Sequence, residues 1–451
     1  MANTVLTRTP SSASNQKTFT MSVWIKRVGP VGTQSAIMCV GNNPSSSMFM
    51  LRFDPDIFNI YGNGSNPNIS THRKFMDTSA WYHVVLAVDT TQATASDRVK
   101  LYVNGVQETS FSTSTYPGQN NDLEVNSTTQ IHIGERPDDN AHFEGYMSHF
   151  HFIDGTAYPA TTFGETDTTT GEWKIKANPG LSQANYGTNG FFILKDGNSV
   201  TDQSGNGNNF TISQGSLTKS EDNPSNNFCT LNLNARKNTS LTIANGATTV
   251  NSSNGGDTGI QSTMSPSSGK FYWEMKSDSA GNTVGIMDQA IQLVDSMMDS
   301  SPSSGIWGLQ RISSGVKTNV YTNGTFTSYT AGSGNNFPNW GNSDVLQCAM
   351  DLDNNKIFFG KNGTFYDNDG NTGDPVNGTN PTFTITAGKN YTVYAENRGA
   401  GTNGNMFNFG NGYFGTTAVS SAGTNASNLG IFEHNVPTGF TALCTKGINS
   451  F

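Results

Sequence analysis

The chain has 451 residues, of which only 13% are charged, and its formal net charge at pH 7 is −9. No run of Lys or Arg could neutralise successive phosphates, and the longest apolar stretches fall far short of the ~20 residues of a membrane-spanning helix, so we expect neither nucleic-acid binding nor membrane insertion. Abundant Gly, Asn, Ser and Thr disfavour helices and favour turns, which indicates an all-β fold, and the length suits two core-forming domains.

Strand patterns begin near the N-terminus. Large apolar and polar residues alternate over residues 19–26, which places Phe19, Met21, Val23 and Ile25 on one face of a strand and points Trp24 the other way. Further strands are predicted at residues 37–40, 48–53, 81–89, 98–103, 131–134 and 145–155. Asn104-Gly105 suits a type I′ hairpin turn, and this density of short strands is typical of a sandwich or jelly roll.

Composition changes after residue 155. Residues 166–170 are rich in Thr, residues 206–209 form a turn cluster, and the apolar runs shrink to residues 191–194. We therefore predict an extended connector that packs on the first domain.

A second set of strand signals follows, at residues 241–243, 270–275, 284–286, 305–309, 345–351, 356–359 and 391–394. One helical pattern interrupts them at residues 288–299, where Ile291, Val294 and Met298 recur at spacings of three and four and Asp288 suits an N-cap. The strands predict a second sandwich.

The predicted architecture is therefore all-β, with two antiparallel β-sandwich (jelly-roll) domains in tandem joined by an extended connector. We place the first domain at residues 1–175, the connector at 176–230 and the second domain at 231–451. No heptad or Gly-X-Y repeat occurs in the sequence, so we expect a homo-oligomer to form through the globular domains.

The cysteines and the N-terminus bear on where the protein is made. Cys39, Cys229, Cys348 and Cys444 are far apart and lack the spacing of a zinc site or a disulfide framework, so we expect buried thiols made in a reducing cytoplasm. Residues 1–8 lack the apolar segment of a signal peptide, so we expect a product found outside the cell to leave by another route.

The first domain resembles a known family. Residues 19–26, 81–85, 99–105 and 131–134, in this order and spacing, look like the concanavalin A/laminin G superfamily, over roughly residues 15–160. The resemblance implies a lectin-like sandwich.

The segment that follows is similar to one found after this domain in many structural proteins of tailed bacteriophages. The similarity lies in residues 152–158, in Gly171-Glu172-Trp173-Lys174 and in residues 202–210. It implies a structural protein of a phage particle.

The second half resembles the SPRY family. Residues 269–274 match its early aromatic strand, and residues 351–363 match its clearest signature, a strand, a polar turn, an aromatic strand and an Asn-Gly turn. Both families serve mainly as recognition scaffolds, so the resemblances imply a binding or architectural module, although a fold alone does not identify the ligand.

Two aromatic residues are candidates for ligand binding. Trp340 and Tyr366 lie among Asn and Gly residues of predicted exposed loops, where their rings could stack on sugars. The alternative is that they anchor a loop or a subunit contact.

No motif predicts a metal or cofactor site. Asp138, Asp139 and Asp154 are weak candidates for calcium, the one cation left open, because lectin-like domains use loop aspartates for it. His149 and His151 alternate around one residue, but no further ligand accompanies them, so hydrogen-bonded or solvent-facing histidines are the favoured interpretation.

Catalytic chemistry has little support. Glycoside hydrolysis needs two carboxylates at a set separation, whereas Glu144, Glu165, Glu172 and Glu274 are scattered, and Gly-x-Ser-x-Gly is absent from the sequence. We therefore expect no catalytic residues and no enzyme.

These observations lead to one hypothesis with two alternatives. The hypothesis is a surface-exposed virion structural protein of a phage, a tail fibre or appendage or a capsid decoration, made in the host cytoplasm. It would contact other virion proteins and bind a host-surface glycan or protein receptor as an adhesin. The alternatives are a glycan depolymerase that acts on host polysaccharide and a host-derived secreted lectin.

Overall fold

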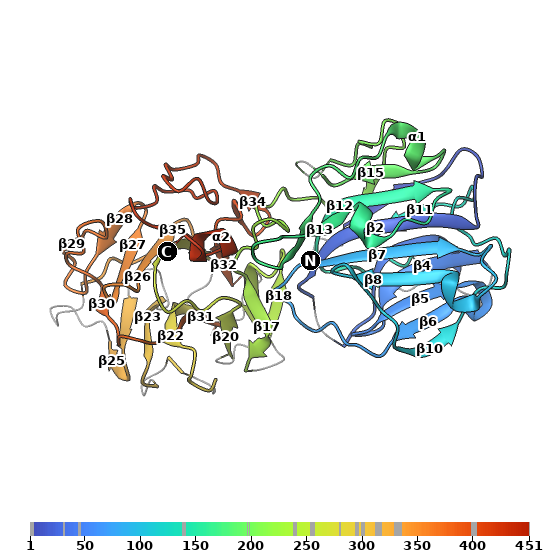
Figure 1. The fold of residues 1–451 in the computed structure, drawn as a ribbon. Helices are drawn as coiled ribbons and strands as arrows, with labels where there is room; N and C mark the ends of the chain where they lie inside the picture. Colours follow the sequence, from blue (N-terminus) through green and yellow to red (C-terminus); the bar gives the residue numbers. More distant parts are fainter. Residues whose placement is uncertain are drawn as a thin grey trace. The chain divides into compact units, whose positions relative to one another are not determined.

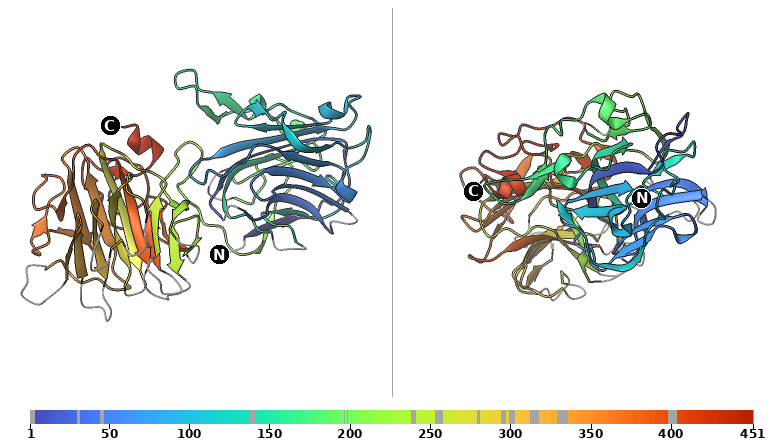
Figure 2. Two further views of the ribbon diagram at one scale, coloured as in Figure 1. Left: turned by 90° about the horizontal axis from the view of Figure 1, so that it is seen from below. Right: turned by 45° about the vertical axis from the view of Figure 1, so that its right-hand side comes forward.

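Strands make up nearly all the regular structure of the described residues, which confirms the all-β prediction (Figure 1). The structure is a computed structural model. It describes residues 4–29, 32–43, 47–137, 141–195, 197, 199–237, 241–252, 258–278, 281–293, 297–298, 303–311, 318–328, 336–397 and 404–450. The chain forms two units, Met1–Lys219 and Ser220–Phe451, and Figure 2 gives two further views of their sheets.

Two antiparallel sheets build the first unit. Sheet A has the order β10-β6-β5-β4-β3-β11-β1-β16, and sheet B the order β15-β12-β2-β7-β8-β9. The strands of sheet A are β1 (Val5–Arg8), β3 (Ser35–Asn43), β4 (Ser47–Phe53), β5 (Phe58–Gly62), β6 (Asn68–Thr71), β10 (Phe111–Thr115), β11 (Ile131–Ile133) and β16 (Thr211–Gln214). Those of sheet B are β2 (Thr18–Arg27), β7 (Tyr82–Asp89), β8 (Val99–Val103), β9 (Val106–Gln107), β12 (Gly145–Asp154) and β15 (Phe191–Ile193).

The core of this unit lies between the sheets, on the strand faces that the sequence predicts. Phe19, Met21, Val23 and Ile25 of β2 are all buried in it. The Phe19 ring meets the Phe49 ring of sheet A edge to face, at 5.4 Å between centroids. Inward apolar residues therefore join the two sheets, and the residues between them point outward.

Residues after β12 complete both sheets and cover one of them. β15 pairs with β12 at the edge of sheet B, and β16 pairs with β1 at the edge of sheet A. Between them lie the short helices η3 (Ala160–Thr162) and α1 (Gln183–Tyr186) and the hairpin of β13 (Gly164–Thr166) and β14 (Trp173–Ile175). The helices η1 (Asn63–Ser65) and η2 (Ala95–Asp97) lie in loops of the same unit.

The second unit also has two main sheets. One has the order β17-β20-β31-β22-β23-β24-β25, and the other the order β18-β19-β32-β21-β26-β27-β28-β29, with β30 beside β27 and β35 beside β21. The strands of the first are β17 (Leu231–Arg236), β20 (Thr258–Ser262), β22 (Thr283–Asp288), β23 (Ile306–Arg311), β24 (Thr318–Thr322), β25 (Thr325–Thr327) and β31 (Tyr391–Asn397). Those of the second are β18 (Leu241–Ala244), β19 (Thr249–Ser252), β21 (Lys270–Ser277), β26 (Leu346–Asp351), β27 (Lys356–Lys361), β28 (Thr364–Tyr366), β29 (Thr372–Gly373), β30 (Phe383–Thr384), β32 (Asn405–Asn408) and β35 (Thr441–Ala442). A separate hairpin, β33 (Tyr413–Phe414) and β34 (Thr417–Ala418), and the helix α2 (Thr445–Ile448) complete the unit.

Strand β21 is buried on both faces. Trp273 packs among aromatic rings that include Phe359, at 6.0 Å between centroids. On the opposite face, the Glu274 carboxylate accepts hydrogen bonds from the backbone N–H groups of Glu433 and His434, both at 2.8 Å. Burial raises the pKa of Glu274 to about 7, although these donors oppose the shift. The C-terminal segment is thus fastened to the outer face of β21.

The predicted helix at residues 288–299 is wrong in the part that the structure describes. Asp288 ends strand β22, and residues 289–293 and 297–298 form turns and irregular chain. Val294 lies outside the described residues. Ile291 packs with Met298 against the β22 sheet, so the helical spacing reflects a loop that covers a sheet face.

The four cysteines are buried and free, as predicted. Burial raises the pKa of the Cys348 thiol well above its ordinary value. These thiols behave as small core residues.

The contact between the sheets gives a test of the first unit. Phe19→Ala removes a fully buried ring, so we expect the free energy of unfolding of this unit to fall by about 3–5 kcal/mol in a denaturant titration. Ile212→Ala is the control, because Ile212 is 45% exposed on β16 and should change stability by less than about 0.5 kcal/mol. Equal effects of the two changes would contradict the proposed core.

Candidate functional site

The two predicted ligand-binding aromatics have different environments. The expectation that Trp340 is exposed is wrong: its side chain is 2% exposed, and its ring lies 6.0 Å from the Arg311 guanidinium. An indole releases much apolar surface from water when it folds inward, and Trp340 therefore offers no face to a sugar here. Tyr366, on β28, is half-buried and meets Phe337 edge to face at 6.1 Å.

The Asp154 carboxylate accepts hydrogen bonds from two neighbouring groups. Its Oδ1 accepts from the Asn126 side-chain amide at 3.0 Å, and its Oδ2 accepts from the Asn189 backbone N–H at 2.9 Å. Asp138 and Asp139 lie outside the described residues. Within the described ranges, no group of three or more His, Cys, Asp or Glu side chains could hold a metal ion.

His149 and His151 are hydrogen-bonded, as the favoured interpretation predicted. A bulge in β12 separates them in register, and His149 has a positive φ of 50°. The Nδ1 atom of His149 lies 2.8 Å from Ser148 Oγ, and that of His151 lies 2.8 Å from the Tyr186 hydroxyl.

The outer face of sheet A carries a polar network that the sequence did not single out. Arg52, Asn59 and Ser70 are cross-strand neighbours on β4, β5 and β6, and Tyr61 and Asn68 are neighbours in the next row. We call the following residues the polar face: Gln34, Arg52, Asp54, Asn59, Tyr61, Asn68 and Ser70.

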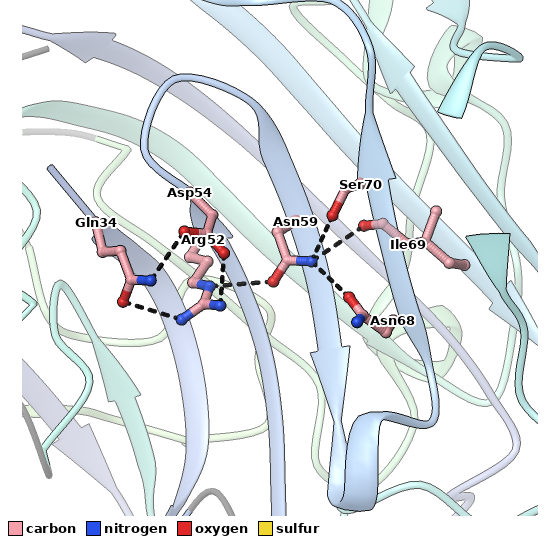
Figure 3. Close-up of polar contacts among 7 residues, drawn as sticks. All are labelled: Gln34, Arg52, Asp54, Asn59, Asn68, Ile69 and Ser70. Carbon is pink, nitrogen blue, oxygen red and sulfur yellow. Dashed lines mark hydrogen bonds and ion pairs between the residues drawn. The ribbon is translucent and has the colours of Figure 1, made fainter. Parts of the chain in front are cut away.

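Arg52 is the centre of the polar face (Figure 3). Its Nε donates to Asn59 Oδ1 at 3.0 Å, its Nη1 to Gln34 Oε1 at 3.2 Å and its Nη2 to Asp54 Oδ2 at 2.7 Å. Gln34 Nε2 in turn donates to Asp54 Oδ1 at 2.8 Å. The guanidinium is therefore held by three planar groups.

Asn59 extends the network toward β6 (Figure 3). Its Nδ2 donates to Ser70 Oγ at 2.9 Å and to Asn68 Oδ1 at 3.0 Å. Asn59 is 2% exposed and Arg52 is 9% exposed, whereas Asn68 and Tyr61 are half-buried. Buried polar groups thus fix the positions of groups that solvent can reach.

The guanidinium group of Arg52 is partly shielded from water. Burial lowers the pKa of its guanidinium, Asp54 opposes this shift, and the positive charge of Arg136 adds to it. The Tyr61 ring lies 5.7 Å from the guanidinium carbon, within cation–π range.

The polar face carries groups that suit the recognition of sugars. Planar amide, guanidinium and carboxylate groups can pair with the hydroxyls of a sugar, since a hydroxyl both donates and accepts, and an aromatic ring can cover an apolar sugar face. Asp54 is the one carboxylate among the seven residues, and it is paired with Arg52, whereas glycoside hydrolysis uses two.

Comparisons with known proteins agree with this architecture. A family model described as concanavalin A-like lectin/glucanases superfamily matches residues 2–161, and the SPRY domain model matches residues 270–395. Residues 2–161 are thus similar to concanavalin A-like domains, and residues 270–395 are similar to SPRY domains. The polar face lies in the first of these, and Tyr366 lies in the second.

Solved SPRY domains also match the chain. The SPRY domain of human HERC1 is 16% identical, with a TM-score of 0.29, and the match covers 39% of this chain and 94% of that domain. The PSpry domain of TRIM65 is 16% identical, with a TM-score of 0.27, and the match covers 40% of this chain and 90% of that domain. No curated protein matches the chain.

Replacing Arg52 tests whether the network is held as described. Arg52→Met keeps the length of the side chain but leaves Asn59, Gln34 and Asp54 without their shared donor, so we expect a loss of about 1–3 kcal/mol in the free energy of unfolding of the first unit. Arg73→Met is the control, since Arg73 forms a 2.9 Å ion pair with Glu108 but is 51% exposed, and about 0–1 kcal/mol is expected. A smaller loss for Arg52→Met than for the control would argue against the network.

Proposed function

We propose that this chain is a non-enzymatic binding protein whose polar face holds a host-surface glycan. The observation that carries the proposal is the Arg52–Asn59 network, in which buried hydrogen bonds orient accessible polar groups beside the Tyr61 ring. Preorganised groups lose little conformational entropy when a ligand binds, which favours recognition.

The accessible groups indicate how a glycan would be held. Gln34 is exposed, and Asp54, Asn68 and Tyr61 are half-buried, so solvent can reach hydrogen-bonding groups and one aromatic ring on the polar face. Binding sites commonly combine a few placed polar groups with an aromatic surface in this way. The concanavalin A-like match supports a lectin-like or adhesin role.

We further propose that the protein is displayed on the surface of a phage particle, as a tail fibre or appendage or a capsid decoration. Two features support this: the similarity of residues 152–210 to segments of tailed-phage structural proteins, and four buried free thiols in recognition-type domains. Free thiols suit assembly in a reducing host cytoplasm before release. Other virion proteins and a host receptor are the expected partners.

Removing the Tyr61 ring tests the binding proposal. On an array of bacterial surface polysaccharides, we expect Tyr61→Ala to weaken binding at least about tenfold, which corresponds to about 1.4 kcal/mol, because the ring loses its contact with the sugar. Tyr61→Phe keeps the ring and should retain most of the affinity. Incubation with the bound polysaccharide should release no reducing ends.

Tyr366→Ala is the matched control in the second unit. If Tyr366→Ala weakens binding and Tyr61→Ala does not, the ligand site belongs to the SPRY domain and the assignment to the polar face fails. Release of reducing ends would favour the depolymerase.

The proposed location has its own test. Antibodies raised against the purified chain should label intact purified particles in immunogold electron microscopy, because an adhesin must be accessible to the host surface. Surface display would be rejected if the antibodies detect the protein only after the particles are disrupted, or do not detect it at all.

A further inference from the structure

A strap crosses the outer face of sheet B. We define it as residues 156–190, the segment between β12 and β15 that contains β13, β14 and α1. Phe163 and Tyr186 of the strap form a buried apolar cluster with Val85 and Ile153 of sheet B, and Trp173 packs against this cluster. The strap thus covers apolar surface that would otherwise face solvent.

Trp173 fastens the strap through a narrow slot. Its Nε1–H donates a hydrogen bond to Nδ1 of His83 on β7, at 3.0 Å. A Cβ atom at Gly105 or at Gly164 would overlap the indole ring, so both glycines permit the close approach. The slot is therefore shaped for this one side chain.

The hydrogen bonds of His83 fix its protonation state. An indole N–H can only donate, so Nδ1 of His83 must be unprotonated and the imidazole must carry its proton on Nε2. Nε2 lies 2.9 Å from Ser22 Oγ, which can accept that proton. The ring also stacks on Trp24 at 4.7 Å. A proton on Nδ1 would meet the indole N–H directly and remove the hydrogen bond that holds Trp173.

The groups around His83 offer little support for an imidazolium. The titratable and charged groups on this face include Tyr146, His149 and His151 of β12, Lys26 of β2, Lys100 and Tyr102 of β8, Tyr158 and Tyr186 of the strap, and Lys195 and Asp202 near β15. In the hairpin itself, Glu165 and Asp167 both pair with Lys174 at the surface, and Glu172 is exposed.

Burial also disfavours the charged form. It lowers the pKa of His83 from 6.5 to about 3, and the neighbouring His149 adds to this shift. Burial likewise lowers the pKa of His151, whose Nδ1 contacts the strap residue Tyr186.

We propose that the strap is an acid-operated latch, in which protonation of His83 at Nδ1 expels Trp173 from its slot and releases the strap from sheet B. While the strap is closed, His83 Nδ1 accepts the Trp173 hydrogen bond and cannot take a proton. Once the strap is open, His83 can be protonated with an ordinary histidine pKa. The contribution of His83 to the free energy of the closed strap is complete above about pH 6.5 and is lost as the pH falls toward about 3. For one imidazole the opening equilibrium rises about tenfold per pH unit in this window.

Hydrogen exchange of the full chain tests the latch. The indole N–H of Trp173, which donates to His83 Nδ1 at 3.0 Å, reports on closure of the strap, because this bond joins the strap to sheet B. Between about pH 6.5 and about pH 4.5 we expect the protection factor of this proton, corrected for intrinsic exchange, to fall at least about tenfold per unit. Protection that does not change with pH overturns the proposal.

Two variants separate the latch from general acid sensitivity. His83→Gln can accept from Trp173 and donate to Ser22 without titrating, so the fall in protection with pH should become less steep by the contribution of one imidazole, and only the contribution of His151, which contacts Tyr186 of the strap, should remain. His72→Gln is the matched control, because His72 is exposed beside Ser110, and the dependence should persist. A pH dependence in His83→Gln that is as steep as in the wild type overturns the proposal.

A third variant tests the latch if His83→Gln does not fold. Trp173→Phe retains a ring but removes the N–H donor, so the NMR titration of the ¹³C-labelled His83 ring should move its pKa toward 6.5, whereas wild-type His83 stays neutral down to about pH 4. An unchanged His83 titration in Trp173→Phe would show that the indole does not control this proton.

Discussion

The edge-to-face contact of Phe19 with Phe49 joins the two sheets of the first unit, and it determines which residues can reach the outer surfaces. Side chains alternate along a strand, so once Phe19 and Phe49 point inward, Trp24 and Arg52 must point outward. The pairing of β4 with β5 then brings Arg52 beside Asn59, and the pairing of β2 with β7 brings Trp24 beside His83. Both outer surfaces follow from one packing constraint.

The two outer surfaces are covered in different ways. Sheet A presents polar groups that satisfy one another, with Arg52 as the shared donor. Sheet B presents apolar and aromatic groups, which the strap covers through Phe163 and Trp173. The polar groups of sheet A are thus held by one another, whereas the apolar groups of sheet B are shielded from water by the strap.

The sequence predicts the strands and turns well because their signals are local. Asn104-Gly105 and Asn362-Gly363 both have positive φ at each residue, as the type I′ hairpin turn requires. The sequence misses the polar face because alternation shows that Arg52 points away from Leu51 but does not show that Asn59 lies beside it. Which residue lies beside Arg52 depends on the register of β4 against β5, and the sequence of one strand does not determine this register.

The failures at Trp340 and at residues 288–299 have the same origin. Asn- and Gly-rich flanks indicate a loop around Trp340, but whether the indole turns inward depends on Arg311, which is distant in sequence. Apolar residues at spacings of three and four are typical of a helix, but they also occur in an irregular segment that packs on one sheet, as Ile291 and Met298 do. Local patterns give element types, whereas burial depends on long-range partners.

The antiparallel pairing of β1 with β16 has a consequence for synthesis. Thr7 meets Thr211, so the first strand of the unit receives its last neighbour only after about two hundred residues have left the ribosome. Until then one edge of β1 has unpaired backbone groups, and such an edge can pair with another nascent chain. Efficient production of this protein therefore depends on keeping growing chains apart until Gln214 has emerged, and a host that spaces its ribosomes closely on the message would favour aggregation.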